Sequence, residues 1–233
     1  MGLHSGVVTA DQVAAAVAQA FAVAMSEALS RRGRFLCAVP GGSVAERVLP
    51  RLARLQLDWS AVHVWLADER MVDPADAESN QRAVRAGWID RVGPPRPVLH
   101  VPPTTRTTAE QAAATYADAL AAVAGVPPRL DVVLLGVGPD GHVASLFPED
   151  PGWRTDDRWA IGVRRAPKPP PERVSLGLAT LAAAAEIWLV AFGPEKAAAI
   201  ARSRDPGSAL PAAVVARSGP SVRWFLDRDA TGS

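Results

Sequence analysis

One histidine of this chain stands where a general base would be useful. His142 follows a strongly apolar run at residues 131–135 and a glycine-rich loop, and Asp140 precedes it by two residues. An imidazole titrates near neutral pH and can take a proton from water, while a nearby carboxylate can orient the ring or favour its protonated form. We therefore predict that His142 is catalytic and that Asp140 assists it. A structural histidine bonded within a tight loop is the alternative.

The loop that carries this histidine contains a G-x-G-x-x-G string, made by Gly136, Gly138 and Gly141. Such a string binds dinucleotides when it opens a helix, but Pro139 removes a backbone donor here and Pro148 interrupts any long helix. No strand that ends in an acid follows about twenty residues later, as that site requires. We therefore expect no cofactor, and we assign Gly138 and Gly141 to substrate binding.

A second glycine turn, Gly41-Gly42-Ser43, follows the apolar run at residues 35–39 and leads into a predicted helix. Two glycines let the backbone approach a ligand closely, and a helix N-terminus offers unpaired N–H groups and the positive end of its dipole. Ser43 can cap the helix or donate its hydroxyl to a phosphate oxygen. The three residues are candidate phosphate contacts, with an ordinary capped turn as the alternative.

Charged residues follow two further apolar runs. In Asp68-Glu69-Arg70, the guanidinium of Arg70 has the planar fork of donors that suits phosphate, and an adjacent carboxylate can hold it in place. We assign Asp68 and Arg70 to the substrate and phosphate site. Lys196 lies near a predicted helix start, where a cation is unfavourable unless an anion binds there. Lys196 and Lys168 are the only lysines among 25 basic residues, which favours a specific role. The alternative for these charges is a solvated surface.

Apolar runs and helical periodicities alternate along the chain. We predict strands, in chain order, at residues 35–39, 61–67, 98–101, 131–135, 173–178, 186–192 and 222–226. Helices are predicted at residues 10–30, 44–55, 79–86, 108–124 and 194–203, with a short one within 208–215. This alternation predicts one α/β domain over residues 1–233, a mostly parallel sheet with helices on both faces. Ligands bind beyond the carboxyl ends of such strands, so the four loops should meet in one crevice.

Composition narrows the function classes. The chain has 25 Lys+Arg against 24 Asp+Glu and a net charge of +1, which argues against a nucleic-acid partner because that needs clustered positive charge. One cysteine, Cys37, excludes an internal disulfide and a cysteine-based zinc site. We expect no metal site, and we expect Cys37, His4, His63 and His100 to be structural.

The sequence lacks a secretory signal, a membrane-spanning run and a nucleophile-elbow motif. Residues 1–6 lack the basic segment of a secretory signal, and no apolar run comes near the roughly 20 residues that span a bilayer. We therefore expect a cytoplasmic protein without membrane contact. Ala45 follows Gly41-Gly42-Ser43-Val44, so the glycine that a G-x-S-x-G nucleophile elbow needs is missing.

These loops, in this order, resemble those of the 6-phosphogluconolactonase family. The matching stretches are Gly41-Gly42-Ser43, Asp68-Glu69-Arg70, Ser79-Asn80 and residues 136–148, 171–176, 193–196 and 210–212. The resemblance spans nearly the whole chain, and the string from Asp140 to Pro148 is its most specific part.

The resemblance implies a Rossmann-like sheet of the type shared with glucosamine-6-phosphate deaminases and ribose-5-phosphate isomerases. It also implies hydrolysis of 6-phospho-D-glucono-1,5-lactone to 6-phosphogluconate, with a small phosphorylated sugar lactone as the only partner and no metal or cofactor. His142 matches the family's base, and Arg70, Lys196 and the glycine-serine turn match its phosphate contacts. Arg173 either touches the ligand or anchors the proline-rich residues 166–171. Whether the chain is a monomer or a homodimer stays open.

Three positions depart from the family pattern. Val44 and Val143 stand where the family usually has threonine, and Pro40 stands where a small residue is common. The loss of two hydroxyls can weaken substrate contacts, but it leaves the predicted base intact. We expect an effect on substrate affinity rather than a loss of activity.

Two alternative functions remain. A sugar-phosphate deaminase or isomerase shares the glycine turn and the D-G-H element, but that class tends to have an aromatic residue in place of Arg70 and a Phe-Asn-Glu-Pro-like string after the histidine. Here the string is Ser145-Leu146-Phe147-Pro148, which favours the lactonase. A non-enzymatic sugar-phosphate sensor is the other alternative. The sequence before the first strand is too short for a helix-turn-helix module, and no basic patch is visible.

Overall fold

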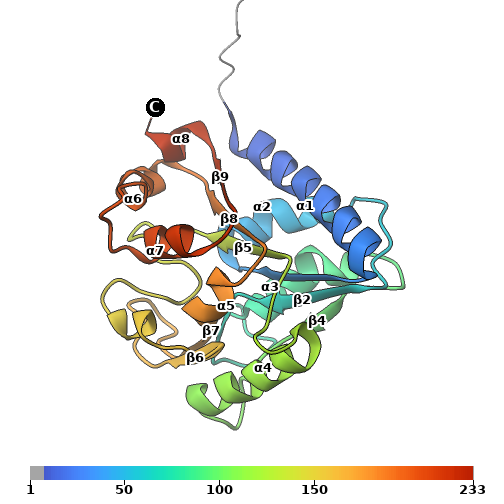
Figure 1. Cartoon of the computed structure of the whole chain (residues 1–233), viewed down its shortest axis with the longest axis horizontal. Helices are drawn as coiled ribbons and strands as arrows, with labels where there is room; N and C mark the ends of the chain where they lie inside the picture. The colour runs from blue at the N-terminus through green and yellow to red at the C-terminus, as the bar shows by residue number, and fades with distance from the viewer. Residues whose placement is uncertain (1–7, 233) are drawn as a thin grey trace, which may run out of the picture.

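A computed structural model describes residues 8–232 of the chain, so His4 lies outside the described residues (Figure 1). Six strands form the main sheet in the order β4-β2-β1-β5-β8-β9, and every neighbouring pair is parallel. The strands are β1 (Phe35–Val39), β2 (Val62–Leu66), β4 (Val98–His100), β5 (Val132–Gly136), β8 (Glu186–Ala191) and β9 (Val222–Leu226). The predicted Rossmann-like, mostly parallel sheet is confirmed.

Helices cover both faces of this sheet, as predicted. One layer holds α1 (Ala10–Arg32), α2 (Gly42–Leu52) and α3 (Asn80–Gly87), and the other holds α4 (Ala109–Ala124), α5 (Leu178–Ala182) and α7 (Pro211–Ser218). The remaining helical segments are α6 (Ala197–Ser203), α8 (Arg228–Thr231) and the 3₁₀ turns η1 (Ile89–Arg91), η2 (Pro151–Arg154) and η3 (Pro194–Lys196).

Alternate side chains of each strand enter opposite layers. Phe35, Cys37 and Val39 of β1 join the hydrophobic cluster beneath α1 and α2, whereas Leu36 and Ala38 join the cluster beneath α4. All five residues are buried, as expected for a parallel strand that is covered on both faces. Cys37 is therefore a core residue, and burial raises the pKa of its thiol well above its ordinary value.

A small second sheet corrects the sequence prediction. β3 (Asp68–Arg70), β7 (Arg173–Leu176) and β6 (Ala160–Val163) pair antiparallel in the order β3-β7-β6. The sequence pattern predicts a polar loop at 68–70, no strand at 160–163 and a strand over 173–178 in the parallel alternation. These segments of three or four residues carry no usable periodicity, so partners distant in sequence decide their pairing. Residues 178–182 form α5 instead of extending β7.

α1 corrects a second expectation. By length and composition alone it is apolar enough to cross a membrane, because alanines fill the positions between its larger side chains. Val13, Val17, Phe21 and Met25 are buried against the sheet and α2, and Leu29 is partly buried beside them, which is the packing of a core helix. Thr9 and Gln12 form a capping box at the start of α1, and Gly33 ends the helix in a left-handed conformation.

Candidate functional site

One cleft lies at the carboxyl ends of the central strands. Its volume is about 400 Å³, and its wall contains residues from the loops after β1, β2, β5 and β8, so the predicted convergence of the four loops is confirmed. The predicted site residues on its wall are Gly41, Gly42, Ser43, Asp68, Arg70, Gly138, His142, Arg173 and Lys196. Asp140 and Gly141, which were also predicted, are not among the residues of the wall.

His142 and Asp140 are hydrogen-bonded to one another. The distance from His142 Nδ1 to Asp140 Oδ1 is 2.5 Å, and the His142 backbone N–H donates to the same carboxylate oxygen at 3.2 Å. Burial favours the protonated form of Asp140, but the hydrogen bond and charge of His142 outweigh it and lower the pKa of this carboxyl to about 2. Asp140 is thus a carboxylate at neutral pH, so Nδ1 carries the proton and Nε2 is left without a partner among residues 8–232.

Glycines shape the loop around this pair. A Cβ at position 138 would lie 2.0 Å from His142 Nδ1 and 2.6 Å from Asp140 Oδ1, so only glycine leaves room for the pair. Gly141 has φ +88°, which favours glycine, and a Cβ there would also press on Leu210 at 2.8 Å. Gly138 belongs to the cleft wall, whereas Gly141 sets the shape of the loop.

The glycine turn after β1 starts α2. A Cβ at Gly41 would lie 1.9 Å from Asn80 Oδ1, and Gly42 has φ +59°. Gly41 is the N-cap residue and no side chain caps the helix, so the prediction that Ser43 can act as the cap is wrong. Ser43 is exposed on the cleft wall instead. The first-turn N–H groups of α2 have no partner within the helix, which suits an anion.

Asp68 is buried at the cleft wall and its carboxylate is occupied by protein groups. Oδ2 accepts the hydroxyl hydrogen of Ser145 at 2.6 Å, and Oδ1 accepts from Asn80 Nδ2 at 3.3 Å. The guanidinium of Arg173 lies 3.9 Å from Oδ2. Asp68 therefore joins β3, α3, β7 and the histidine loop.

Glu69 fixes the start of α3. Its two oxygens accept the hydroxyl hydrogen of Ser79 and the backbone N–H groups of Arg70, Asn80 and Gln81, at 2.6–3.1 Å. Burial raises the pKa of this carboxyl although the three backbone hydrogen bonds oppose the shift. Glu69 thus positions the backbone of Arg70 and the first turn of α3.

Arg70 lies on the cleft wall beside Glu78. Its Nη1 donates to the Glu78 backbone carbonyl and lies 3.5 Å from the Glu78 carboxylate. Its buried Nε–H has no partner among the described residues, and the side chain lines the cleft.

Arg173 holds the proline-rich loop in place, which is one of the two roles that the sequence left open for it. Its Nε donates to the Pro170 carbonyl at 3.1 Å and its Nη2 donates to the Lys168 carbonyl at 3.0 Å, and the guanidinium lies over the Phe147 ring. Burial lowers its pKa, which nearby Asp68 partly offsets. Arg173 therefore anchors the proline-rich loop and also lines the cleft.

Three polar residues of the cleft wall, Glu78, Asn80 and Lys168, were not assigned to the site from the sequence. Lys168 enters the cleft from the loop that Arg173 anchors, and Asn80 fills the space beside Gly41. Both lysines of the chain therefore face the same cleft, and their rarity was the signal for Lys168. Burial lowers the pKa of Lys196; Glu195 opposes this shift, while the charge of Lys168 adds to it.

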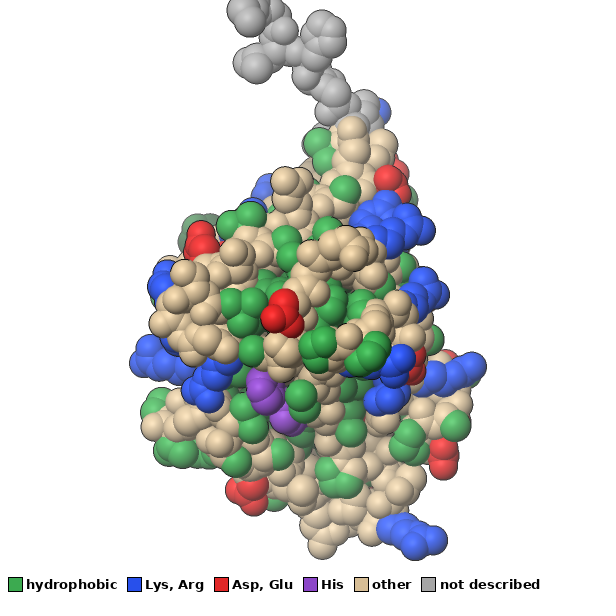
Figure 2. All heavy atoms as spheres, turned by 90° about the vertical axis from the view of Figure 1, so that its right-hand side faces the viewer, with side chains coloured by type: hydrophobic (Ala, Val, Ile, Leu, Met, Phe, Trp, Pro, Cys, Tyr) green, Lys and Arg blue, Asp and Glu red, His purple; other side chains and the backbone are tan. Residues whose placement is uncertain are grey.

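His63 and His100 are absent from the cleft wall. His63 Nδ1 and His100 Nε2 are 3.0 Å apart on β2 and β4, and the His100 ring stacks on Trp65 with 4.2 Å between ring centres. Figure 2 shows histidine atoms at the surface on the side of the molecule where β4 lies. Within residues 8–232, no group of three His, Cys, Asp or Glu side chains is placed to hold a metal ion.

Comparison with known proteins gives consistent matches. A family model described as glucosamine-6-phosphate isomerases/6-phosphogluconolactonase matches residues 8–224. A 6-phosphogluconolactonase of Streptomyces coelicolor is 38% identical over 94% of this chain and 90% of its own length. A crystal structure of 6-phosphogluconolactonase from Thermotoga maritima superposes with a TM-score of 0.83 at 25% identity, over 92% of this chain and 94% of that one.

A monomeric glucosamine-6-phosphate deaminase shares the fold, with a TM-score of 0.81 over 97% of both chains. Its identity of 18% limits that likeness to the fold.

Proposed function

Because the chain belongs to the glucosamine-6-phosphate isomerase/6-phosphogluconolactonase family, we propose that it hydrolyses 6-phospho-D-glucono-1,5-lactone to 6-phosphogluconate in the oxidative pentose phosphate pathway. The observation that carries the proposal is the His142–Asp140 pair, whose histidine lines a cleft that also contains two lysines and the start of α2. A histidine base beside an anion-binding surface is what lactone hydrolysis on a phosphorylated sugar requires.

In the proposed reaction, His142 acts as the base. Its Nε2 takes a proton from water, and the resulting hydroxide attacks the lactone carbonyl carbon. The tetrahedral intermediate then breaks the bond to the ring oxygen, and the imidazolium returns the proton to that oxygen as the ring opens. A δ-lactone is an activated ester, so one positioned base suffices. Ionised Asp140 holds the ring through Nδ1 and stabilises the imidazolium.

Three N–H groups of the loop after β5 are not free to bind the negative charge that develops on the carbonyl oxygen. The N–H groups of Gly138, Gly141 and His142 are bonded to His142 O, Gly138 O and Asp140 Oδ1 respectively. Arg70, which lines the cleft outside this loop, is a further residue with donors for the substrate.

The phosphate is assigned to the cationic part of the cleft. Lys196 and Lys168 line it together, and the turn Gly41-Gly42-Ser43 adds the free N–H groups of α2. Binding a remote phosphate fixes the lactone carbonyl against His142, which turns binding energy into rate.

The chain as a whole is proposed to act as one cytoplasmic domain. Both hydrophobic clusters pack against the same six-stranded sheet, and the single cysteine is a buried thiol that suits a reducing compartment.

The test is the rate of lactone disappearance, with the lactone generated in situ and compared for wild type, His142→Ala and no enzyme. His63→Ala is the matched control, because it removes a partly buried histidine outside the cleft. We expect acceleration by wild type and by the control, and none by folded His142→Ala. Wild-type rates equal to spontaneous hydrolysis would contradict the proposal. Ammonia release from glucosamine 6-phosphate would then indicate a deaminase, and binding without turnover a sensor.

A further inference from the structure

The tight turn that follows His142 has an unusual backbone. The Leu146 N–H donates to the Val143 carbonyl at 3.0 Å, and Ala144, the first central residue, has φ +49°. Within residues 8–232, only Arg106 shares a positive φ among non-glycine residues. A turn with its left-handed residue at that position favours glycine, so alanine there stores strain. Such strain persists only where the surroundings hold the turn, and it often marks a functional position.

Ser145, the second central residue of the turn, supplies that restraint. Its hydroxyl donates to Asp68 Oδ2 at 2.6 Å and its backbone N–H donates to Ser175 Oγ at 3.2 Å. Asp68 and Ser175 are directly opposed on the paired strands β3 and β7. Ser145 is 1% exposed, so both bonds are shielded from water. The turn is thereby fastened to two strands of the second sheet.

The acceptor of the serine hydroxyl is itself fixed. Asn80 Nδ2 donates to the Asp68 backbone carbonyl at 2.8 Å and lies 3.3 Å from Asp68 Oδ1. The guanidinium of Arg173 lies 3.9 Å from Asp68 Oδ2. Asp68 can therefore resist a movement of the turn, which a freely rotating carboxylate could not do.

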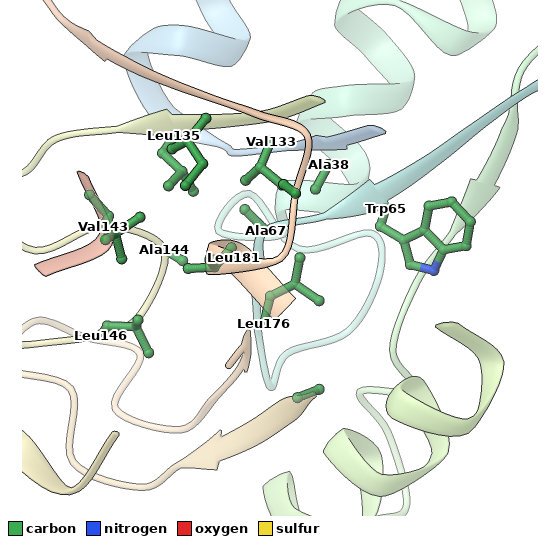
Figure 3. Close-up of a cluster of buried hydrophobic side chains, with 14 of the residues drawn as sticks. Ala38, Trp65, Ala67, Val133, Leu135, Val143, Ala144, Leu146, Leu176 and Leu181 are labelled. Atoms are coloured by element: carbon green, nitrogen blue, oxygen red, sulfur yellow. The ribbon is translucent and has the colours of Figure 1, made fainter. Parts of the chain in front are cut away.

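Packing holds the two ends of the turn and leaves its centre at the cleft. Val143 and Leu146 are fully buried, and Figure 3 shows them with Leu135 and Leu181 in the cluster between the two sheets. Ala144 lines the cleft, and His142 is one residue from the turn. A shift of the turn would therefore be transmitted to the histidine.

We propose that Ser145 is a positioning residue for the proposed lactonase reaction: its hydrogen bond to Asp68 holds the strained turn at Ala144 and thereby fixes His142 in the cleft. The inference rests on the proposed function. Ser145 is absent from the cleft wall, so it acts through the turn and not by touching substrate.

The first experiment compares Ser145→Ala with Ser203→Ala. Ser203 is the matched control, because it is also a buried serine but its hydroxyl has no partner and it lies on α6 outside the cleft. We expect Ser145→Ala to lower kcat about 10- to 100-fold, since small displacements of a catalytic group have effects of that size. KM should change less than about 3-fold because the phosphate contacts remain. Ser203→Ala should match wild type in both parameters.

A second variant separates positioning from mere stability. Glycine adopts φ +49° without strain, so Ala144→Gly combined with Ser145→Ala should regain thermal stability relative to Ser145→Ala alone. If Ser145 positions the histidine, kcat should stay low in this folded double variant, which also serves if the single variant does not fold. Recovery of kcat together with stability would overturn the inference, as would an unchanged kcat in Ser145→Ala. A wild type without lactonase activity would overturn the proposed function as well.

Discussion

His142 donates its Nδ1–H to a carboxylate of Asp140 that is ionised at neutral pH, over 2.5 Å. Since the carboxylate can only accept, the tautomer of the neutral ring is settled: Nε2 carries the lone pair. The same carboxylate oxygen accepts the backbone N–H of His142, so ring and backbone are held by one group. Asp140 itself is absent from the cleft wall, whereas His142 lies on it.

Replacing Asp140 by asparagine should impair turnover more than binding. The amide can donate to Nδ1, which favours the tautomer that has its proton on Nε2 and cannot accept one from water. We expect Asp140→Asn to lower kcat by about 100-fold or more while KM changes little. Steady-state kinetics on lactone generated in situ measures both. Asp150→Asn, which changes a carboxylate outside this cleft, is the control. Unchanged kcat in Asp140→Asn would remove Asp140 from the mechanism.

Adding one methyl group at Gly138 should displace the histidine. A Cβ there would lie 2.0 Å from His142 Nδ1 and 2.1 Å from Cε1, so the ring must move. We expect Gly138→Ala to lower kcat by about 100-fold. Gly93→Ala is the control because its added Cβ meets nothing within 4 Å. Equal activity of both variants, each folded by circular dichroism, would show that the ring position does not limit the reaction.

The main sheet and the meeting of its loops were predictable because each central strand is a continuous apolar run. The second sheet was not. Asp68-Glu69-Arg70 shows no strand periodicity, and it becomes β3 only because Arg173–Leu176, about a hundred residues later, pairs with it. The hydrogen bond between Ser145 and Asp68 also joins residues that are far apart in sequence, separated by 77 positions. Nothing local in either segment encodes that contact.

The residue types of the candidate site could be predicted from the sequence, but which residue contacts which could be predicted only in part. His142 and Asp140 are neighbours in sequence, so their pairing followed from the string itself. The roles of Arg173 and Lys168 could not be assigned from the sequence, because only the folded loop shows that Arg173 donates a hydrogen bond to the backbone carbonyl of Lys168. The alternative of Ser43 as a cap fails because the helix begins at Gly42, two residues earlier than the predicted start at residue 44.

Lys168 and Lys196 should lower KM for a phosphorylated lactone and should have no effect on a lactone without phosphate. Both line the cleft, so replacing either by glutamine removes a positive charge from the proposed phosphate site. We expect Lys196→Gln and Lys168→Gln each to raise KM for the phosphorylated lactone about 10-fold, as loss of a charged hydrogen bond does. Rates on glucono-1,5-lactone, which has no phosphate, should stay at the wild-type level.

The control for this comparison is Arg204→Gln, which removes an exposed charge outside the cleft. Equal losses on both lactones would show that the lysines act on the reaction or the fold and not on the phosphate.

The histidine pair at the edge of the sheet should make the fold sensitive to mild acid. Burial, reinforced by the charge of His63, lowers the pKa of His100 from 6.5 to about 4. Between these values the unfolded chain binds the proton and the folded chain does not, so this group's contribution to stability is complete above pH 6.5 and is lost as the pH falls towards 4. His100→Phe keeps a ring over Trp65 but cannot be protonated. Urea unfolding of both proteins at pH 7.5 and pH 5 gives the comparison, and the wild type should lose more free energy of unfolding than the variant on acidification. A stability difference that is the same at both pH values would show that His100 is protonated equally in the folded and unfolded chain.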